Sequence, residues 1–426
     1  MTTDPILRWN AVLLDVIRRG GGPAGPLARG AAMMHAAVHD AVNAIVPAHV
    51  PYLVAIPASP DASIDAAIAQ AAHDALLAVF PSTPVDVGGA LRDVLATLPA
   101  SPAVAAGRAI GTACAYLMIA AREHDGAAAG ASHADGAKPG EWRSTDGAHA
   151  ASPQWRAVTP FTMSAPSQFR PPAPGGGRSP AELLRGREYA RQLAEVKALG
   201  EATSARRTAE QTEIAFFWSN DADGTCKPVG QLLQITRAVS EQRGLGVVDN
   251  ARLFALVSLA LADAAICAWD AKYTSCLWRP ETAVHEAGDD ANPRTEADAA
   301  WEPLSHEGAV HRTPPSPSYV SAHATLAAAH ATVMRLFFGS DDIAFTVTSE
   351  DPNLPAGAKR SFDSFSEAAA EHARSRVLLG VSFGWDTKEG ARAGAALAEA
   401  LFRAHLCVSQ DTPRFEKRPA KVSTAV

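Results

Sequence analysis

The chain has 426 residues, a length that allows a large buried core and two or three domains. Its formal net charge of -7 at pH 7 argues against a surface that binds nucleic acid or an anionic membrane. Apolar residues make up 47% of the chain and aromatic residues only 6%. Much of the apolar share is alanine, which favours closely packed helices.

The five cysteines are odd in number, scattered and without the spacing of a zinc site, which is typical of reduced thiols. The first five residues lack the basic and apolar regions of a signal peptide. Asp263 interrupts the best apolar run, residues 253–269, so we expect no membrane span. The sequence therefore predicts a soluble, cytoplasmic protein.

Helical periodicity dominates the first part of the chain. The first predicted helix ends at the three glycines 20–22. Residues 124–142 are rich in Gly, Ala and Ser and predict a loop, and five prolines within residues 164–180 predict an extended or turned crossing. The helices predicted here are residues 9–19, 26–45, 63–79, 86–97 and 103–123.

Helices also dominate the rest of the chain. Residues 286–317 are polar and proline-rich and predict an irregular surface connection, and residues 343–348 predict a short strand or extended piece. The tail after Asp411 is basic and is expected to be loose. The helices predicted in this part are residues 179–199, 208–218, 250–272, 320–338, 365–379 and 388–405.

The sequence shows no βαβ alternation, so the predicted fold class is mainly α, a helical bundle with little or no sheet. We expect one large helical domain over residues 1–410, followed by a loose tail at 411–426. Its predicted parts are the N-terminal helices 8–123, the proline-rich crossing 142–180 and a C-terminal bundle 205–405 that carries an anion site.

Lys272 and Arg279 are the first candidate anion ligands. Seven residues separate them, close to two helical turns, so both side chains can point the same way. Pro280 disfavours helical geometry at Arg279 and can aim its guanidinium into a pocket. The same pattern also fits an ordinary solvated helix end.

Ser321, Ala322 and His323 come at a predicted helix start, after a proline-rich approach. The free N–H groups of a helix start attract anions. Ser321 can donate to an anion or cap the helix, which is the commoner role of a serine there. His323 stands where a proton carrier beside the anion would lie.

Arg376 and Ser382 form the last segment, Ser-Arg-x5-Ser. A spacing of six residues is a poor match to one face of a continuous helix, so the chain must turn after Gly380 for the two to share a pocket. Alone, Arg376 would more often be a structural ion-pair partner. Because its segment follows the other two in the chain, Arg376 becomes a stronger candidate for an anion ligand.

The three segments in this order resemble the signature of the vanadium-dependent haloperoxidase and type 2 phosphatidic acid phosphatase superfamily. That signature is Lys-x6-Arg-Pro, then Pro-Ser-Gly-His or a variant, then Ser-Arg-x5-His. Residues 32–44, 166–172 and 208–213 also resemble bacterial haloperoxidase-like members. The similarity runs from about residue 8 to residue 405.

The resemblance implies a role for each matched residue. Lys272, Arg279 and Arg376 match the cations that neutralise vanadate or phosphate oxygens, Ser321 and the amide of residue 322 match further donors, and His323 matches the acid/base histidine. Two positions depart from the pattern. Ala322 replaces the usual glycine, and Ser382 replaces the histidine that ligates vanadium or forms the phosphohistidine.

Loss of that histidine is expected to change the chemistry. A serine hydroxyl is a poor substitute for imidazole as a vanadium ligand or nucleophile at neutral pH. The remaining cations can still bind vanadate or phosphate non-covalently. We also expect the three cations to lower the pKa of His323, which leaves a neutral base beside an oxyanion hole.

The sequence therefore predicts a vanadium-independent acid/base enzyme without a cofactor, which rearranges, isomerises or cyclises a bacterial natural-product intermediate. Two alternatives stay open: a functional vanadium-dependent haloperoxidase that oxidises halide with hydrogen peroxide, and a non-catalytic anion-binding protein. We expect a small-molecule substrate, no nucleic-acid or membrane partner, and a homodimer.

Four other histidines and one cysteine were weighed as site residues. His35 and His39 have the i, i+4 spacing of a metal pair, but no third ligand follows, so no metal site is predicted. His330 and His372 can face His323 or Arg376 and replace the lost ligand, although an ordinary helical role is the more common one. Cys276 lies between Lys272 and Arg279 without a sign of an activated thiol.

Overall fold

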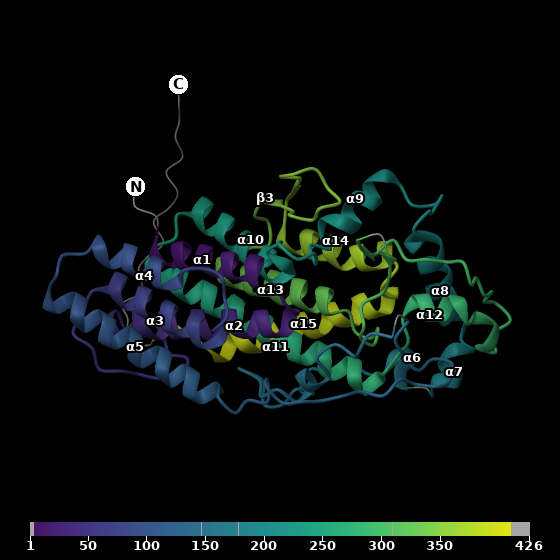
Figure 1. The fold of residues 1–426 in the computed structure, drawn as a ribbon, viewed down its shortest axis with the longest axis horizontal. Helices are drawn as coiled ribbons and strands as arrows, with labels where there is room; N and C mark the ends of the chain where they lie inside the picture. The colour runs from purple at the N-terminus through teal and green to yellow at the C-terminus, as the bar shows by residue number, and fades with distance from the viewer. Residues whose placement is uncertain (1–3, 146, 178, 309, 410–426) are drawn as a thin grey trace, which may run out of the picture.

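The computed structural model describes residues 4–145, 147–177, 179–308 and 310–409, and these are mostly helical (Figure 1). The predicted mainly α class is therefore confirmed. The N-terminal helices are α1 (Pro5–Gly20), α2 (Ala24–Ile45), α3 (Ile64–Val79), α4 (Val87–Ala96) and α5 (Pro102–Arg122).

The middle of the chain holds shorter elements. They are η1 (Pro153–Ala157), α6 (Pro174–Gly177), α7 (Pro180–Leu184), α8 (Arg187–Gly200), α9 (Ala209–Phe217) and α10 (Lys227–Arg243). The remaining elements are α11 (Val247–Ser275), α12 (Pro280–His285), η2 (Ala287–Asp289), β1 (His306–Glu307), β2 (Val310–His311), α13 (Ala322–Phe338), β3 (Phe345–Thr348), β4 (Lys359–Phe362), α14 (Phe365–Leu378) and α15 (Gly384–Ala404).

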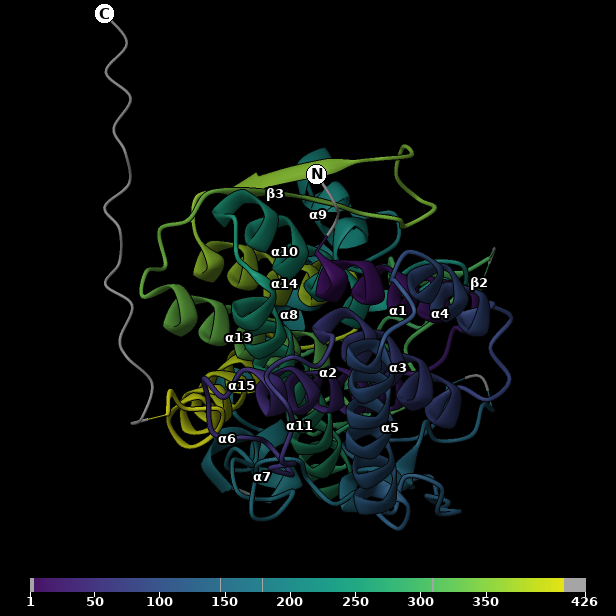
Figure 2. The same ribbon diagram turned by 90° about the vertical axis from the view of Figure 1, so that its left-hand side faces the viewer.

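Helix α11 is the centre of the bundle. Every residue from Leu253 to Tyr273 is buried, because α2, α10, α13 and α15 pack around the helix. Figure 2 shows these helices nearly end-on. Within the described part of the chain two helices, α5 and α11, are long and apolar enough to cross a membrane; the most apolar window of α11 is 94% buried inside the bundle and that of α5 is 33% buried. An all-round apolar helix is expected at the core of a large soluble fold.

The ends of the bundle are covered by different parts of the chain. Helices α3, α4 and α5 lie together at one end, and α6, α7, α8 and α12 lie at the other (Figure 1). Helices α13, α14 and α15 pack against one another between these ends. They carry the last two predicted site segments, so the bundle brings together residues from distant parts of the sequence.

Several predicted boundaries were wrong, each for a local reason. Helix α1 begins at Pro5, because the Asp4 side chain caps it by accepting from the amides of Ile6 and Leu7. The single helix predicted over residues 179–199 is two helices, separated at Arg185 and Gly186. Helix α15 begins at Gly384 and not at residue 388.

Helices α10 and α12 were not predicted. Helix α10 buries polar as well as apolar side chains, including Gln231 and Thr236, so its sequence has no clear apolar stripe. Helix α12 has only six residues, too few to show a period.

The sheet content is two short antiparallel hairpins. The predicted strand within residues 343–348 is confirmed as β3, which pairs with β4 so that Phe345 lies opposite Phe362. Within the region predicted as irregular, β1 pairs with β2. The tail predicted to be loose lies outside the described residues.

Candidate functional site: a buried oxyanion site

Lys272 and Arg279 approach each other across a turn. Lys272 is in the last turn of α11, and the chain leaves that helix at Cys276 in a left-handed conformation with φ 47°. Arg279 precedes α12 with φ -80° and ψ 158°, the non-helical geometry predicted from Pro280. The expectation that one helical face aligns both cations was therefore wrong, because the helix ends between them.

Both cations hold the segment that leads into α13. Arg279 donates from Nε to the Ser316 carbonyl at 2.6 Å, from Nη2 to the Ser316 hydroxyl at 2.9 Å, and from Nη1 to the Val381 carbonyl at 2.7 Å. Lys272 donates from Nζ to the carbonyl oxygens of Pro317 at 2.7 Å and Ser318 at 3.2 Å. The two cations thus tie three chain segments into one site.

Burial disfavours the charged forms of both side chains. It is the largest influence on the pKa of Lys272, which lies well below its usual value, and neighbouring Arg279 lowers that pKa further. Burial likewise lowers the pKa of Arg279 to about 10. An anion that entered the site would favour the charged forms of both side chains.

Asp386, in the first turn of α15, is an acidic residue of the site that the sequence analysis did not select. Its side chain is fully buried and accepts from the Ser318 hydroxyl at 2.5 Å and from the Phe383 amide at 2.8 Å. Burial raises its pKa to about 6, against the opposing influence of these hydrogen bonds and of Lys272.

Ser321 caps α13, the commoner of its two predicted roles. Its hydroxyl oxygen accepts from the Ala324 amide at 3.3 Å, and its own amide donates to the Asp386 carbonyl at 3.0 Å. Ala322 is the first residue of the helix. His323 follows in the first turn, at the positive end of the helix dipole.

His323 lies beside Arg376 and an acidic residue that was also not predicted, Asp221. Its Nε2 atom is 3.3 Å from the Asp221 carboxylate, and the same carboxylate is 3.8 Å from the Arg376 guanidinium. Arg376 is 4% exposed, and its Nη1 atom has no hydrogen-bond partner among the described residues. A buried guanidinium nitrogen without an acceptor is a donor available to a bound oxyanion.

The pKa of His323 is lowered, as predicted, but the main cause is not the predicted one. Its pKa is lowered from 6.5 first by burial and then by Arg376, while Asp221 acts in the opposite direction. Of the three predicted cations, Arg376 alone is among these causes. The expected direction agrees, and the resulting imidazole is a neutral base at pH 7.

The turn predicted after Gly380 is present and precedes Ser382. Gly380 has φ +76°, and a Cβ atom there would lie 2.5 Å from the Gly200 carbonyl oxygen, so the turn needs glycine. The Val381 amide donates back to the Arg376 carbonyl at 3.2 Å, and the Val381 carbonyl accepts from Arg279. Ser382, 2% exposed, therefore follows directly after a residue that contacts the site.

His330 and His372 lie behind His323. His330 pairs with the Thr236 hydroxyl at 3.0 Å. The His372 ring stacks on Trp218 at 4.5 Å between centroids and meets the His323 ring edge-on at 5.5 Å. His372 is fully buried, and its pKa lies well below 6.5, first because of burial. These contacts give the rings packing roles behind the acid/base candidate.

The remaining histidine and thiol candidates have structural surroundings. Asp40 accepts from the amides of Tyr52, Leu53 and Val54 and so anchors a loop. Burial lowers the pKa of His35 to about 3. Within the described residues no cluster suited to a metal ion occurs. Burial raises the pKa of the Cys276 thiol, which opposes reactivity.

A cavity of about 490 Å³ borders the segment that leads into α13. Its lining includes Tyr319 and Trp385 together with charged residues of α8 and α15, and it does not include His323. A smaller internal cavity of about 10 Å³ lies between Trp218, His330 and His372.

Comparisons with known proteins show what this chain is similar to. Residues 252–409, which contain the cations, His323 and Ser382, match the family model of the second helical-bundle domain of VCPO. A vanadium chloroperoxidase of Curvularia inaequalis is 27% identical over 230 residues. That match covers 43% of this chain and 37% of the fungal protein's length.

Two solved structures share the fold. A bacterial vanadium-dependent iodoperoxidase matches with a TM-score of 0.80 and 23% identity, over 96% of this chain and 98% of that one. The apo form of a bacterial vanadium-dependent chloroperoxidase matches with a TM-score of 0.70 and 17% identity, over 89% and 94%. The chain therefore shares the fold of these vanadium-dependent haloperoxidases, and its C-terminal bundle is similar to the second helical-bundle domain of VCPO.

Proposed function

We propose that the chain is an acid/base enzyme on the haloperoxidase scaffold, and that it holds its substrate's oxyanion by hydrogen bonds. The observation that carries this proposal is the placement of His323 against Asp221 and Arg376, together with serine at position 382. The chain has a proton carrier and anion donors there but no imidazole at residue 382.

The residues fit an oxyanion better than a covalently ligated vanadate. Arg376 offers a free donor, and each charge-assisted hydrogen bond contributes roughly 1.5–3 kcal/mol. Vanadate or phosphate can bind in this non-covalent manner. The hydroxyl of Ser382 is a weak ligand without an activating base, so it does not replace an imidazole that bonds to vanadium.

The proposed reaction is a proton-transfer isomerisation of a small carbonyl compound. Neutral His323 removes a proton from the carbon next to the carbonyl, and the resulting enolate oxygen accepts from Arg376. Asp221 stabilises the imidazolium. His323 then returns the proton to a different atom of the substrate, so the substrate is isomerised without an oxidant or a reductant.

Proton exchange in heavy water tests this proposal before the substrate is known. The purified protein is incubated with a panel of α-hydroxy ketones, and deuterium incorporation at the α-carbon is followed by NMR. We expect exchange or isomerisation that His323→Gln reduces at least 100-fold. Full activity in His323→Ala would eliminate the proposed acid/base role.

A haloperoxidase is the second candidate, because the compared structures of the same fold are haloperoxidases. Two measurements separate the two candidate functions. The protein is loaded with vanadate, desalted and analysed for vanadium, and it is then assayed with bromide and hydrogen peroxide. We expect little retained vanadium and no bromide oxidation. Stoichiometric vanadium with bromide-dependent turnover would establish the haloperoxidase.

Ser382→His is the matched gain-of-ligand variant. If residue 382 occupies the ligand position, the new imidazole should increase vanadate retention at least tenfold over wild type. Unchanged vanadate retention and unchanged activity would show that residue 382 does not occupy the ligand position.

The third possibility is a non-catalytic anion-binding protein. Such a protein would bind phosphate in a calorimeter, lose that binding in Arg376→Ala, and catalyse no exchange.

A further inference from the structure

Asp221 lies on a short loop, residues 219–226, that joins α9 to α10 and is here called the Asp221 loop. Its backbone is unusual: Asn220 has φ 44° and Lys227, the first residue of α10, has φ 56°. Non-glycine residues rarely adopt this conformation, and they persist in it where surrounding contacts determine the backbone.

The side chain of Lys227 contacts Asp221 directly. Its side chain is 8% exposed, and Nζ donates to the Asp221 carbonyl at 2.5 Å and to the Asp223 carboxylate at 2.9 Å. A lysine is rarely buried unless its ammonium is paired. Both acceptors of this ammonium belong to the Asp221 loop.

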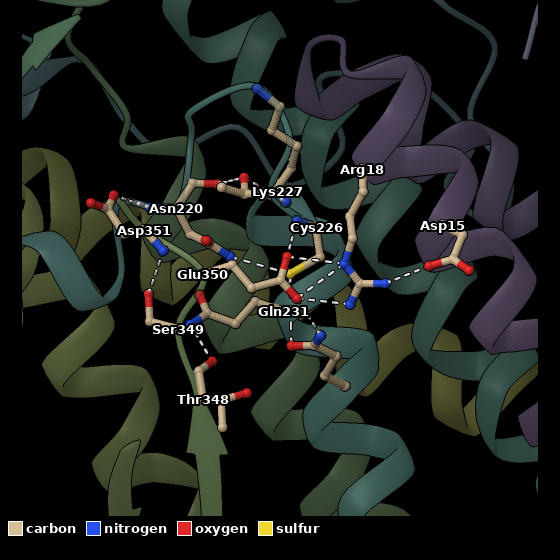
Figure 3. Close-up of polar contacts among 12 residues, drawn as sticks. Asp15, Arg18, Asn220, Cys226, Lys227, Gln231, Thr348, Ser349, Glu350 and Asp351 are labelled. Carbon is tan, nitrogen blue, oxygen red and sulfur yellow. Dashed lines mark hydrogen bonds and ion pairs between the residues drawn. The ribbon is translucent and has the colours of Figure 1, made fainter. Parts of the chain in front are cut away.

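The two ends of the loop are anchored separately (Figure 3). The Asn220 amide donates to Asp351 at 3.1 Å, and the Cys226 amide donates to Glu350 at 2.7 Å. Glu350 is in turn held by Arg18 of α1. Lys227 contacts Asp221 and Asp223, which lie between these two anchored residues.

We propose that Lys227 is a positioning residue whose ammonium holds Asp221 against His323 and Arg376 and so tunes the acid/base histidine. This inference rests on the proposed function, because it assigns Lys227 to the same site. Asp221 is about half exposed, so water would compete for its carboxylate if the loop were released. Lys227 itself touches neither His323 nor the oxyanion position.

The charged and titratable groups that face His323 define what should change. Asp221 comes from the loop, and Arg376 and His372 come from α14. Burial and Arg376 disfavour the imidazolium of His323, whereas the Asp221 carboxylate and a backbone hydrogen bond with Ser219 favour it. Release of Asp221 therefore moves the titration of His323 to lower pH.

The experiment follows the imidazole of His323 by NMR in the full-length protein labelled at histidine, with the signal assigned by its absence in His323→Gln. We expect Lys227→Met to lower the titration midpoint by about half to one pH unit. Asp221→Asn should produce a similar shift, and the double variant should shift little further because both changes break one linkage. Lys227→Arg should restore most of the wild-type midpoint.

The matched control is Lys197→Met, which removes a lysine of α8 that bonds the Glu296 carbonyl and has no contact with the Asp221 loop. A folded Lys227→Met protein with the wild-type midpoint, while Asp221→Asn shifts it, would overturn the proposal. If Lys227→Met does not fold, Lys227→Gln takes its place. Its side-chain amide still donates, so it should shift the His323 titration midpoint by less. An unshifted midpoint in Lys227→Gln would also overturn the proposal. Turnover is not the readout, so loss of the proposed isomerase activity leaves this test intact.

Discussion

His323 and Asp386 are two buried ionisable residues whose pKa values move in opposite directions. Burial disfavours the charged form of each, so it lowers the pKa of His323 and raises that of Asp386 to about 6. Near pH 7, His323 is neutral and able to accept a proton. Turnover should hold at neutral pH and fall only below pH 6.5, as His323 becomes protonated. A rate that falls already above pH 7 on acidification would contradict this assignment.

Asp386→Asn should change the pH dependence of stability. The pKa of Asp386 in the folded protein, about 6, exceeds the ordinary aspartate value of 3.8. Its contribution is therefore fully present below pH 3.8 and lost as pH rises through about 6, a difference of up to about 3 kcal/mol. Asparagine can still accept from Ser318 and Phe383 but does not ionise. In urea unfolding at pH 4, 5.5 and 7, wild type should lose stability relative to the variant, and parallel profiles would refute the shift.

At the scale of elements, the close contact between α13 and α15 positions His323 relative to Asp386. A Cβ atom at Gly394 would lie 2.1 Å from the Thr325 carbonyl oxygen, a backbone atom that cannot rotate away. Gly394→Ala should therefore separate the helices and reduce the free energy of unfolding by about 1–3 kcal/mol. Gly20→Ala is the control, because nothing lies within 4 Å of a Cβ there, and it should be neutral or stabilising. Equal melting temperatures for the two variants would disprove the contact.

At the scale of the whole molecule, Arg18 joins the first helix to the C-terminal half. It donates to both oxygens of Glu350, at 3.0 Å from Nε and 2.7 Å from Nη2 (Figure 3). Arg18→Ala should cost about 1–2 kcal/mol of stability. Arg92→Ala, which removes the fully solvated pair with Asp86, should cost less than about 0.5 kcal/mol.

The pH dependence of this tie follows from Glu350. Partial burial raises its pKa, but hydrogen bonds from Arg18 and Gln234 outweigh burial and hold the pKa below 4.5. The contribution is present above pH 4.5 and is lost as pH falls through the folded-state pKa. Calorimetry should show the largest difference in Tm between wild type and Arg18→Ala near neutral pH. A difference that widens on acidification would exclude the Arg18–Glu350 pair as its cause.

The expected homodimer stays a prediction at this scale. Light scattering on the purified chain should give twice the 44.4 kDa of one copy. A mass of 44.4 kDa at micromolar concentration would show a monomer.

The sequence by itself determined the helical class, most of the helices and the order of the three site segments. Alanine-rich helical periodicity is local and repeated, so it can be recognised in the sequence without knowledge of the tertiary structure. Two positions also predicted local backbone geometry from the sequence. Pro280 restricts the backbone of Arg279 before it, and Gly380 fits a crowded left-handed turn that needs glycine.

The tertiary structure alone decided which acidic groups belong to the site. Asp221 lies on a loop between helices, 102 positions before His323, and no local pattern distinguishes it from a solvated aspartate. Asp386 reads as an ordinary acidic residue of a first helical turn until the packing of α13 against α15 buries it. The pKa shifts of His323 and Asp386 come mainly from burial, and burial is a property of the packed bundle, which no single segment of the sequence contains.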